Sequence, residues 1–208
     1  MSLFITFEGG EGTGKSTQIG LLRLSLEGLG RKVLQLREPG GSPLGEYLRA
    51  WLMDNTRSLE PASELLLFTA ARAELVQTIL KPQLNAGFDI LLDRYADSTT
   101  VYQGFARNVP MRYVNSANNL AKGGLTPDLT ILLDAPPEIS LHRASQRDGA
   151  KANQPRFENA NIAFHHKVRS GFLKLASRSP ETWLVINAEL GIQEIHSTIL
   201  AKVRNLIF

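Results

Sequence analysis

A glycine-rich octapeptide near the amino terminus carries the strongest chemical signal in the sequence. It spans residues 9–16 and follows the spacing of a glycine, four residues, a second glycine, a lysine and a serine. Glycine lets backbone N–H groups approach phosphate oxygens closely, because no side chain stands in the way. Lys15 can reach the outer phosphates of a triphosphate, and the Ser16 hydroxyl is placed to bind Mg²⁺. The octapeptide therefore predicts a site for ATP, or less favourably GTP, with Mg²⁺.

The residues around this octapeptide support the prediction. A glycine-rich turn could also join a strand to a helix without binding anything. Here an apolar run typical of a strand precedes the turn, and the residues after it have helical spacing. A helix that begins at this point adds the positive end of its dipole to an anion site. The positions predicted to surround the donor phosphates are Gly9, Gly10, Glu11, Gly12, Thr13, Gly14, Lys15, Ser16 and Thr17.

A second candidate site lies at the end of another apolar run. Residues 88–92 are followed by Asp93 and Arg94. A carboxylate at the end of a strand can order Mg²⁺ or its water ligands, and a guanidinium can bind an anionic acceptor with two parallel hydrogen bonds. An Asp–Arg pair at a strand end is also common on ordinary protein surfaces. Together with the octapeptide, however, the pair indicates a metal-side carboxylate and an acceptor-binding arginine.

Five short apolar runs alternate with longer helical patterns along the chain. The runs are continuous, which is typical of strands buried on both faces. This order predicts an α/β fold of three layers, in which a five-stranded parallel sheet has helices on both faces. Ligands of such sheets bind beyond the carboxyl ends of the strands. The predicted strands cover residues 3–7, 32–36, 88–92, 129–133 and 183–186, and the predicted helices cover residues 15–29, 43–53, 61–80, 111–121, 137–147, 159–176 and 192–206.

The composition narrows the class of protein. The chain has 208 residues and no cysteine. A single domain over residues 1–208 can therefore bury its own core, and a disulfide scaffold, a cysteine nucleophile and thiolate metal sites are excluded. No apolar run approaches the roughly 18 residues of a membrane span, and the first residues lack the pattern of a signal peptide. We expect a cytoplasmic protein with no membrane partner, and the net charge of +3 is too small to indicate nucleic acid.

Four segments of the chain resemble, in this order, the signature sequences of the bacterial thymidylate kinase family. They are residues 7–17, residues 37–42, residues 93–104 and residues 127–134. The resemblance extends from the first predicted strand almost to the carboxyl terminus. It implies a P-loop NTPase fold with a lid segment, and ATP-dependent phosphorylation of thymidine 5′-monophosphate. It also implies a homodimer.

The resemblance further implies which residues bind the acceptor. In this family an aromatic ring stacks on thymine and an arginine binds its O4 atom, and Phe68 and Arg72 match those positions. Their spacing of four places them on one helix face, although a core phenylalanine and a snorkelling arginine explain the same pattern. Tyr102 matches the ring that crowds the 2′ position of the sugar. The other matches are Glu11 at the sugar 3′-hydroxyl, Thr99 and Gln103 at the base edge, Arg49 and Arg94 at the acceptor phosphate, and Pro39 in the acceptor site.

Positive charge is concentrated between residues 143 and 169, which include six basic and two acidic side chains. The part up to residue 158 is rich in glycine, asparagine, glutamine and proline, as loops are. It could be a solvated loop, a polyanion-binding patch or a lid over the donor phosphates. A patch for nucleic acid would need interleaved aromatic residues, whereas cations on a lid would stabilise the charge of a transferred phosphoryl group. We therefore expect a lid at about residues 143–158.

The octapeptide contains no arginine of its own. The family includes members that supply the catalytic arginine from the lid instead, and the chain resembles these. By that resemblance Arg156 is the first candidate, Arg147 is the second, and Arg143 lies against the adenine. The expected catalytic groups are thus Lys15, Asp93, Arg94, Arg156 and Arg147. Two alternatives stay open: a kinase for another nucleoside monophosphate, and a nucleotide-dependent switch or partition ATPase.

Overall fold

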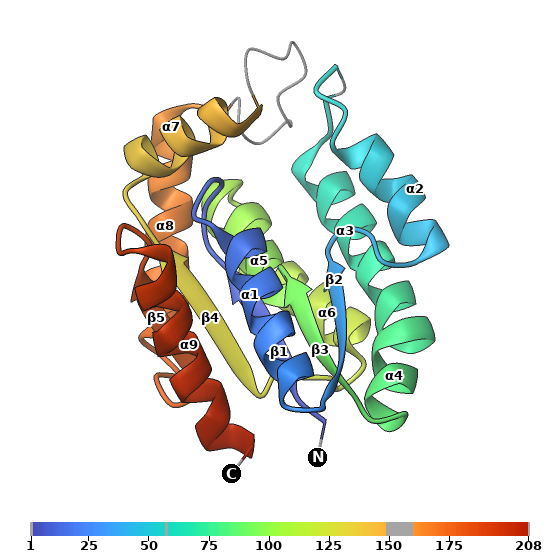
Figure 1. The fold of residues 1–208 in the computed structure, drawn as a ribbon. Coiled ribbons are helices and arrows are strands. Elements are labelled where there is room, and N and C mark those ends of the chain that lie inside the picture. The colour runs from blue at the N-terminus through green and yellow to red at the C-terminus, as the bar shows by residue number, and fades with distance from the viewer. Residues whose placement is uncertain (1, 57, 149–159, 208) are drawn as a thin grey trace.

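Five parallel strands form a sheet at the centre of the described chain, as the sequence predicts (Figure 1). The computed structural model describes residues 2–56, 58–148 and 160–207. The strand order is β2-β3-β1-β4-β5, so β1 is central and β2 and β5 form the edges. The strands are β1 (Phe4–Glu8), β2 (Lys32–Arg37), β3 (Phe88–Asp93), β4 (Leu129–Asp134) and β5 (Trp183–Asn187).

Helices cover both faces of this sheet, which completes the predicted three layers (Figure 1). The helices α1 (Lys15–Gly28) and α9 (Ile192–Ile207) pack on one face. Within the described residues, no helix is both long and apolar enough to cross a lipid bilayer. The other helical elements are α2 (Pro43–Leu52), α3 (Pro61–Leu75), the π-helical turn η1 (Val76–Leu80), α4 (Lys81–Asn85), α5 (Ala96–Thr99), the π-helical segment η2 (Thr100–Ala106), α6 (Met111–Lys122), α7 (Pro137–Asp148) and α8 (Ile162–Ala176).

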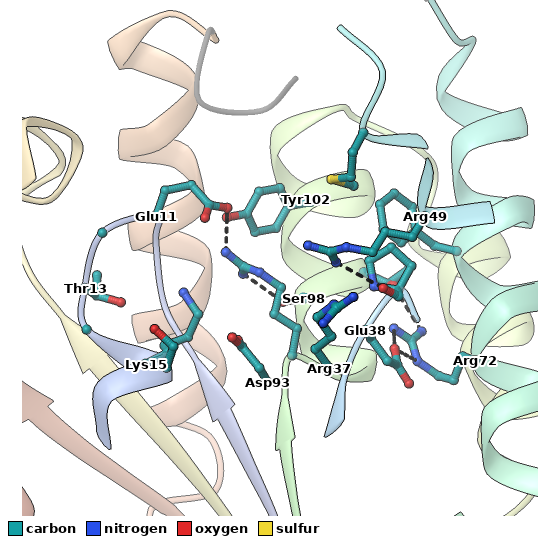
Figure 2. Close-up of a pocket in the computed structure, with 18 of the residues that line it drawn as sticks. Glu11, Thr13, Lys15, Arg37, Glu38, Arg49, Arg72, Asp93, Ser98 and Tyr102 are labelled. Carbon is teal, nitrogen blue, oxygen red and sulfur yellow. Dashed lines mark hydrogen bonds and ion pairs between the residues drawn. The ribbon is translucent and has the colours of Figure 1, made fainter. Parts of the chain in front are cut away.

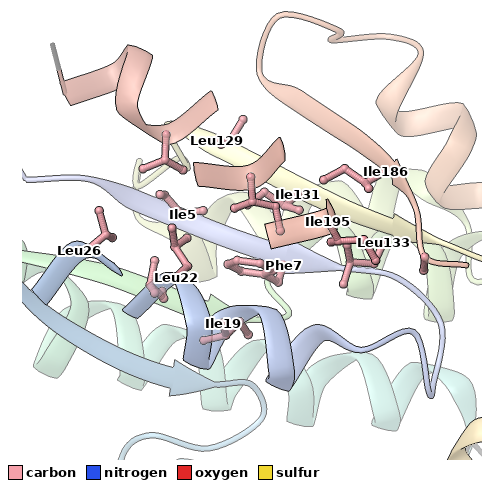
Figure 3. Packing of buried hydrophobic residues seen from close by; sticks show 14 of the residues in the cluster. Ile5, Phe7, Ile19, Leu22, Leu26, Leu129, Ile131, Leu133, Ile186 and Ile195 are labelled. Atoms are coloured by element: carbon pink, nitrogen blue, oxygen red, sulfur yellow. The ribbon is translucent and has the colours of Figure 1, made fainter. Parts of the chain in front are cut away.

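Alternate side chains of β1 enter two different cores. Ile5 and Phe7 point to one face and pack with Leu22 of α1 and Ile195 of α9 (Figure 3). Phe4 points to the other face, where it packs with side chains of α3 and η1. Each buried apolar side chain of this size contributes about 1.5–3 kcal/mol to folding. The two cores therefore hold β1, and the turn that follows it, firmly against α1.

The prediction that all strands are buried on both faces is confirmed for β1, β3 and β4 but wrong for β2 and β5. The residues of β2 are half-buried or exposed, and β5 buries one residue, Ile186. Both are edge strands, which neighbouring elements cover less completely. A continuous apolar run does not distinguish a central strand from an edge strand.

The helix predicted over residues 159–176 begins at Ile162, and other predicted helix ends shift by about one residue, but two regions differ more strongly. The helix predicted over residues 61–80 is α3 followed by the π-helical η1, and α4 then continues it to Asn85. No helix is predicted at residues 96–106, where α5 and η2 form. Their sequence lacks a regular apolar period because polar side chains such as Thr99 and Gln103 are buried at a cavity rather than exposed to solvent.

Candidate active site

A cavity of about 450 Å³ lies beyond the carboxyl ends of β1, β2 and β3 (Figure 2). Its volume falls in the range of small-molecule binding sites. Lys15 and Asp93 lie at one end of it, and Arg49 and Arg72 lie at the other. The predicted site residues that line it are Glu11, Gly12, Thr13, Gly14, Lys15, Ser16, Thr17, Pro39, Arg49, Phe68, Arg72, Asp93, Arg94, Thr99, Tyr102, Gln103 and Arg143.

Four predicted site residues are not among those that line the cavity. Gly9 and Gly10 contribute carbonyl oxygens that accept hydrogen bonds from the Lys15 ammonium group, so they support the site from behind. Arg147 belongs to α7, but its side chain lies outside the part of the chain that is described. Arg156 and most of the predicted lid at residues 143–158 also lie outside it.

The phosphate loop, residues 9–16, joins β1 to α1 and is packed against α7. Gly12 has a φ of +71°, and a Cβ atom there would lie 1.9 Å from the carbonyl oxygen of Ser140. A Cβ atom at Gly9, where φ is +138°, would lie 2.5 Å from the carbonyl oxygen of Leu133. Both positions therefore require glycine for steric as well as conformational reasons. The close packing holds the loop in one shape before any ligand binds.

Lys15 is the first residue of α1, and 7% of it is exposed. Its ammonium group donates to the carbonyl oxygens of Gly10 at 2.7 Å and Gly9 at 3.3 Å. Burial, assisted by the charge of Arg94, lowers the pKa of Lys15 below its ordinary value, against the opposing effect of Asp93. Phosphate oxygens bound in the cavity would supply the negative charge that compensates the buried ammonium group of Lys15.

Asp93 is the last residue of β3 and has a buried oxygen, Oδ1, without a hydrogen-bond partner among the described residues. An orphaned carboxylate oxygen at a cavity is suited to a cation or a bound water. Ser16 is exposed at the same cavity. In the described part of the chain, no group of three His, Cys, Asp or Glu side chains could hold a metal. These residues fit Mg²⁺ bound mainly by phosphate and water, as is usual for this ion.

Arg94 follows Asp93 with a left-handed backbone, at a φ of +69°. Its guanidinium donates to the carbonyl oxygen of Gly9 at 3.0 Å, to the Ser98 hydroxyl at 3.2 Å and to Glu11 Oε1 at 2.6 Å. It also lies over the ring of Tyr102, with its Cζ atom 5.1 Å from the ring centroid. A non-glycine residue in this conformation costs free energy, and these contacts hold it there. Arg94 is thus aimed across the mouth of the phosphate loop.

Glu11 and Tyr102 meet at this arginine. Tyr102 donates its hydroxyl to Glu11 Oε1 at 3.4 Å. Burial would raise the pKa of Glu11, but the charges of Arg94 and Lys15 and the Tyr102 hydrogen bond outweigh burial and lower it. Glu11 is therefore a carboxylate at neutral pH and can accept a further hydrogen bond from a ligand hydroxyl.

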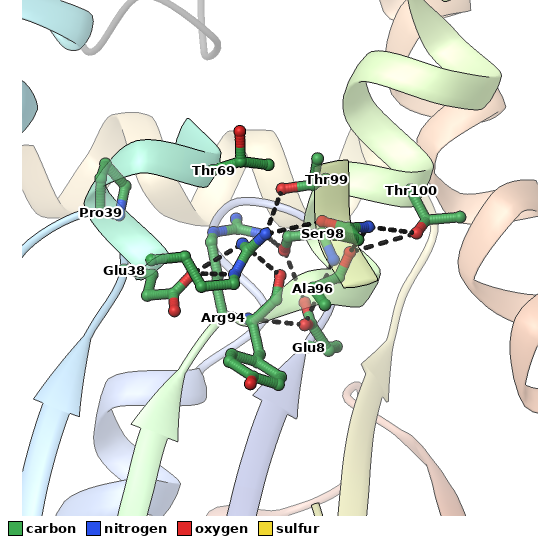
Figure 4. A network of polar contacts seen from close by, with 12 residues as sticks. Glu8, Glu38, Pro39, Thr69, Arg94, Ala96, Ser98, Thr99 and Thr100 are labelled. Carbon is green, nitrogen blue, oxygen red and sulfur yellow. Dashed lines mark hydrogen bonds and ion pairs between the residues drawn. The ribbon is translucent and has the colours of Figure 1, made fainter. Parts of the chain in front are cut away.

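Glu8, which the sequence does not single out, anchors the segment after β3 from below (Figure 4). It is completely buried at the end of β1. Oε1 accepts the N–H of Tyr95 at 2.9 Å and that of Ser98 at 3.3 Å, and Oε2 accepts the Ser98 hydroxyl at 2.6 Å. Burial, together with nearby Asp97, raises the pKa of Glu8 from 4.5 to about 8, although Arg94 opposes the shift.

This raised pKa predicts a pH-dependent stability. Between pH 5 and pH 8 the folded protein retains a proton on Glu8 that the unfolded chain has lost, so stability falls as the pH rises, by up to about 1.4 kcal/mol per pH unit. Glu8→Gln cannot titrate. We therefore expect the unfolding free energy of the variant, minus that of the parent, to increase from pH 5 to pH 8 in urea titrations. A difference that is constant over this range would contradict the prediction.

Arg72 of α3 also holds the segment after β3. It is 1% exposed, so the snorkelling alternative is wrong. Its Nη1 group donates to the Thr99 hydroxyl at 3.0 Å and to Asn118 Oδ1 at 2.8 Å. Its Nη2 group donates to the carbonyl oxygen of Tyr95 at 3.0 Å, its Nε group donates to Glu38 Oε2 at 2.8 Å, and the guanidinium forms an ion pair with the same carboxylate oxygen. All three guanidinium nitrogens thus already donate to protein acceptors, and a base carbonyl would be one acceptor more.

The partners of Arg72 predict that it supports the fold as well as the cavity. Removal of one member of a buried ion pair leaves the other charge uncompensated, at a cost of about 3–5 kcal/mol. Arg72→Ala should therefore lower the unfolding free energy in urea by that amount. A matched control is Arg23→Ala, which breaks a 3.7 Å pair with Glu27 on the surface of α1 and should cost less than about 1 kcal/mol. Equal losses in the two variants would contradict this role.

Arg49 and Arg37 also line the cavity. Arg49 donates to the carbonyl oxygen of Pro39 at 3.0 Å. Arg37, to which the sequence analysis assigns no role, pairs with Glu46 of α2 at 3.0 Å, and Glu46 also accepts the Gly41 N–H at 2.9 Å. Two features of the sequence could have identified Arg37 as a site residue. It begins the family-like segment at residues 37–42, and it lies at the end of a strand. These two arginines add positive charge to the cavity.

Arg143 lies on α7 at the rim of the cavity. It is exposed, and its Nη1 group donates to the carbonyl oxygen of Ala188 at 2.7 Å. The contact joins α7 to the loop after β5. The guanidinium is therefore held by a backbone carbonyl where α7 borders the cavity.

The chain is similar to known proteins of one kind over nearly its whole length. The family described as thymidylate kinase matches residues 7–199. A thymidylate kinase of Geotalea uraniireducens is 47% identical over 206 residues, which cover 98% of this chain and 97% of the relative. A thymidylate kinase of Deinococcus radiodurans is 44% identical over 202 residues, covering 97% of this chain and 96% of the relative.

A solved structure is similar as well. The crystal structure of thymidylate kinase from Ehrlichia chaffeensis superposes with a TM-score of 0.78 at 30% sequence identity. The superposition covers 98% of each chain. The similarity in three dimensions thus extends over the sheet, its helices and the elements around the cavity.

Proposed function

The chain belongs to the thymidylate kinase family, and from this membership we propose how its cavity transfers the γ-phosphoryl group of ATP to thymidine 5′-monophosphate. The protein is a nucleoside monophosphate kinase that forms thymidine 5′-diphosphate, with ATP as the phosphate donor. The observation that carries the proposal is that Lys15 and Arg94 line one cavity, from the segments that follow the adjacent strands β1 and β3. Lys15 suits the phosphates of the donor, ATP, and Arg94 suits the 5′-phosphate of the acceptor.

The donor end of the cavity is the phosphate loop. Its backbone N–H groups and the dipole of α1 would surround the β and γ phosphates, and Lys15 would leave the carbonyl oxygens of Gly9 and Gly10 to bind them. Ser16 and Asp93 would hold Mg²⁺, directly or through water. When bound, this ion neutralises phosphate charge. Arg143 would lie against the adenine at the rim.

The acceptor end is formed by the segments after β2 and β3 and by α3. Arg94 and Arg49 would hold the 5′-phosphate, because planar guanidinium groups bind phosphate in a bidentate way. Phe68 would stack on thymine, and the groups at the base edge are Arg72, Thr99 and Gln103. Pro39 lines the acceptor pocket, Tyr102 would crowd the sugar 2′ position, and Glu11 would accept the 3′-hydroxyl.

The chemistry requires no general base, because a phosphate acceptor is already anionic at neutral pH. The contribution of the protein is to align the two phosphates and to stabilise the charge that spreads over the transferred group. A further cation for that charge is predicted from sequence alone at Arg156 or, second, Arg147.

A coupled assay of ADP release with separate monophosphates tests this function. Thymidine 5′-monophosphate should be the best acceptor, ahead of the uridine, cytidine and guanosine monophosphates. Equal rates with the uridine and thymidine nucleotides would exclude a base-specific site and favour the broader kinase. ADP release that needs no acceptor would instead favour the switch or partition ATPase, which the family membership does not support.

We also propose that two copies associate, and that the enzyme works in the cytoplasm. Large apolar side chains are exposed on three helices: 72% of Tyr47 on α2, 63% of Leu66 on α3 and 84% of Leu120 on α6. Contiguous exposed apolar patches mark protein–protein interfaces, and α3 packs against both α2 and α6. Sedimentation velocity should give the mass of a dimer, and Leu120→Glu should lower it if α6 contributes to the contact.

A further inference from the structure

Gln103 lines the cavity from η2 and is 1% exposed. Its side-chain amide has two different ends: the Nε2 group donates two hydrogen bonds, and the Oε1 atom accepts them. The end that faces the cavity decides what kind of group on a base Gln103 can bind. A thymine or uracil ring presents an N–H at position 3, whereas cytosine presents a bare nitrogen there.

A buried carboxylate behind Gln103 determines this orientation. Glu64, in the first turn of α3, is completely buried, and its Oε1 accepts a hydrogen bond from Gln103 Nε2 at 2.8 Å. The same oxygen accepts from Arg107 Nε at 3.2 Å, so the negative charge of Glu64 is compensated. A carboxylate accepts hydrogen bonds and cannot donate them. Gln103 must therefore turn its Nε2 group toward Glu64.

The opposite end of the amide is then left for a ligand. Among the described residues, no group donates to Gln103 Oε1, and this atom is not enclosed, unlike the buried polar atoms that lack partners. It therefore has access to the cavity that Gln103 lines. An acceptor atom at that place matches a ring N–H and opposes a bare ring nitrogen.

We propose that Glu64 is a positioning residue that holds the amide of Gln103 with its Oε1 atom toward the base, and so selects acceptors whose ring carries an N–H at position 3. The proposal rests on the proposed function, in which Gln103 lies at the base edge. Glu64 touches no substrate itself. It acts on Gln103 alone, because its carboxylate prevents the orientation in which Nε2 would face the cavity and Oε1 would face Glu64.

The test is the acceptor selectivity of Glu64→Gln, measured as kcat/KM for the 2′-deoxy monophosphates of thymidine, uridine and cytidine. A glutamine at position 64 can donate, so the amide of Gln103 is free to flip. We expect the thymidine-to-cytidine ratio to fall at least about tenfold, as loss of a defined buried hydrogen bond predicts. The thymidine-to-uridine ratio should stay constant, because both bases carry the N–H. A parallel loss with all three acceptors, or an unchanged thymidine-to-cytidine ratio, would overturn the proposal.

Two control variants distinguish an error in the role of Glu64 from an error in the placement of Gln103 at the base. Glu74→Gln makes the same chemical change on α3 away from the cavity and should alter neither ratio. Gln103→Met removes both ends of the amide and should also collapse the thymidine-to-cytidine ratio. If Gln103→Met retains that ratio, the placement of Gln103 at the base is wrong. If Gln103→Met loses it while Glu64→Gln keeps it, Glu64 alone has been misassigned.

A measurement on the unmodified enzyme keeps the proposal testable if Glu64→Gln does not fold. In protein with ¹⁵N-labelled glutamine, the side-chain amide of Gln103, assigned with Gln103→Met, should exchange slowly with water before any nucleotide is added. Protection that appears only when thymidine 5′-monophosphate binds would mean that Nε2 faces the cavity, and would overturn the proposal.

Discussion

Lys15→Met should lower kcat about 10²- to 10³-fold, the usual effect of removing one charge-stabilising donor from a reaction centre. The ammonium group is buried at the start of α1 and occupies the carbonyl oxygens of Gly9 and Gly10 while no phosphate is bound. Methionine keeps the length and apolar character of the stem, so the loop should keep its shape. Steady-state kinetics with saturating ATP and thymidine 5′-monophosphate measure the loss.

The control for Lys15 is Lys167→Met, which removes an exposed lysine from α8 and should leave kcat within a factor of two or so, as for surface substitutions in general. Thermal unfolding of both variants should confirm that the fold is kept. A kcat within tenfold of the parent for Lys15→Met would show that the charge on the transferred group is stabilised elsewhere in the site.

Arg94→Met should lower kcat/KM for thymidine 5′-monophosphate by about 10²- to 10³-fold, as expected when a charged partner of a phosphate is lost and Glu11 remains unpaired. Arg94 is held in its left-handed conformation by contacts with Gly9, Ser98 and Glu11. It is therefore already aimed before the acceptor arrives. Most of the loss should appear in the KM for the acceptor, and the KM for ATP should change little.

A matched control for this second effect is Arg112→Met, which removes an exposed arginine of α6 that does not line the cavity. Its kinetics should equal those of the parent. Arg94→Lys is informative as well, because an ammonium group cannot form the bidentate contact and should recover only part of the loss. Equal increases in the KM values for ATP and acceptor would mean that Arg94 supports the phosphate loop rather than the acceptor.

The parts of the site that could be predicted from sequence are those that local spacing determines. Lys15 and Ser16 follow a strand within one short pattern, and Asp93 ends another strand, so the parallel sheet must bring them to the same edge. Phe68 and Arg72 share a helix face for the same local reason. All five of these residues line the cavity, and their individual roles in it stay predictions.

The parts that could not be predicted depend on partners far apart in the chain. Arg72 bonds Glu38 and Asn118, which are 34 and 46 residues away, and no local pattern reveals such a network. Glu8 follows the predicted strand at residues 3–7, and nothing local indicates that the fold brings Tyr95 and Ser98 to its carboxylate. Likewise, the helical segment at residues 96–106 takes its shape from the cavity that it borders, not from an apolar period.

The packing of Gly12 limits how this active site could change. A catalytic cation could in principle be moved from elsewhere into the phosphate loop, but any side chain at position 12 would run into the backbone of α7 at Ser140 and Ala144. Gly10 is different, since a Cβ atom there would meet nothing closer than 3.8 Å. The loop thus offers a new side chain room at one glycine and none at the other. A redesign that puts an arginine at position 12 would also have to rebuild α7.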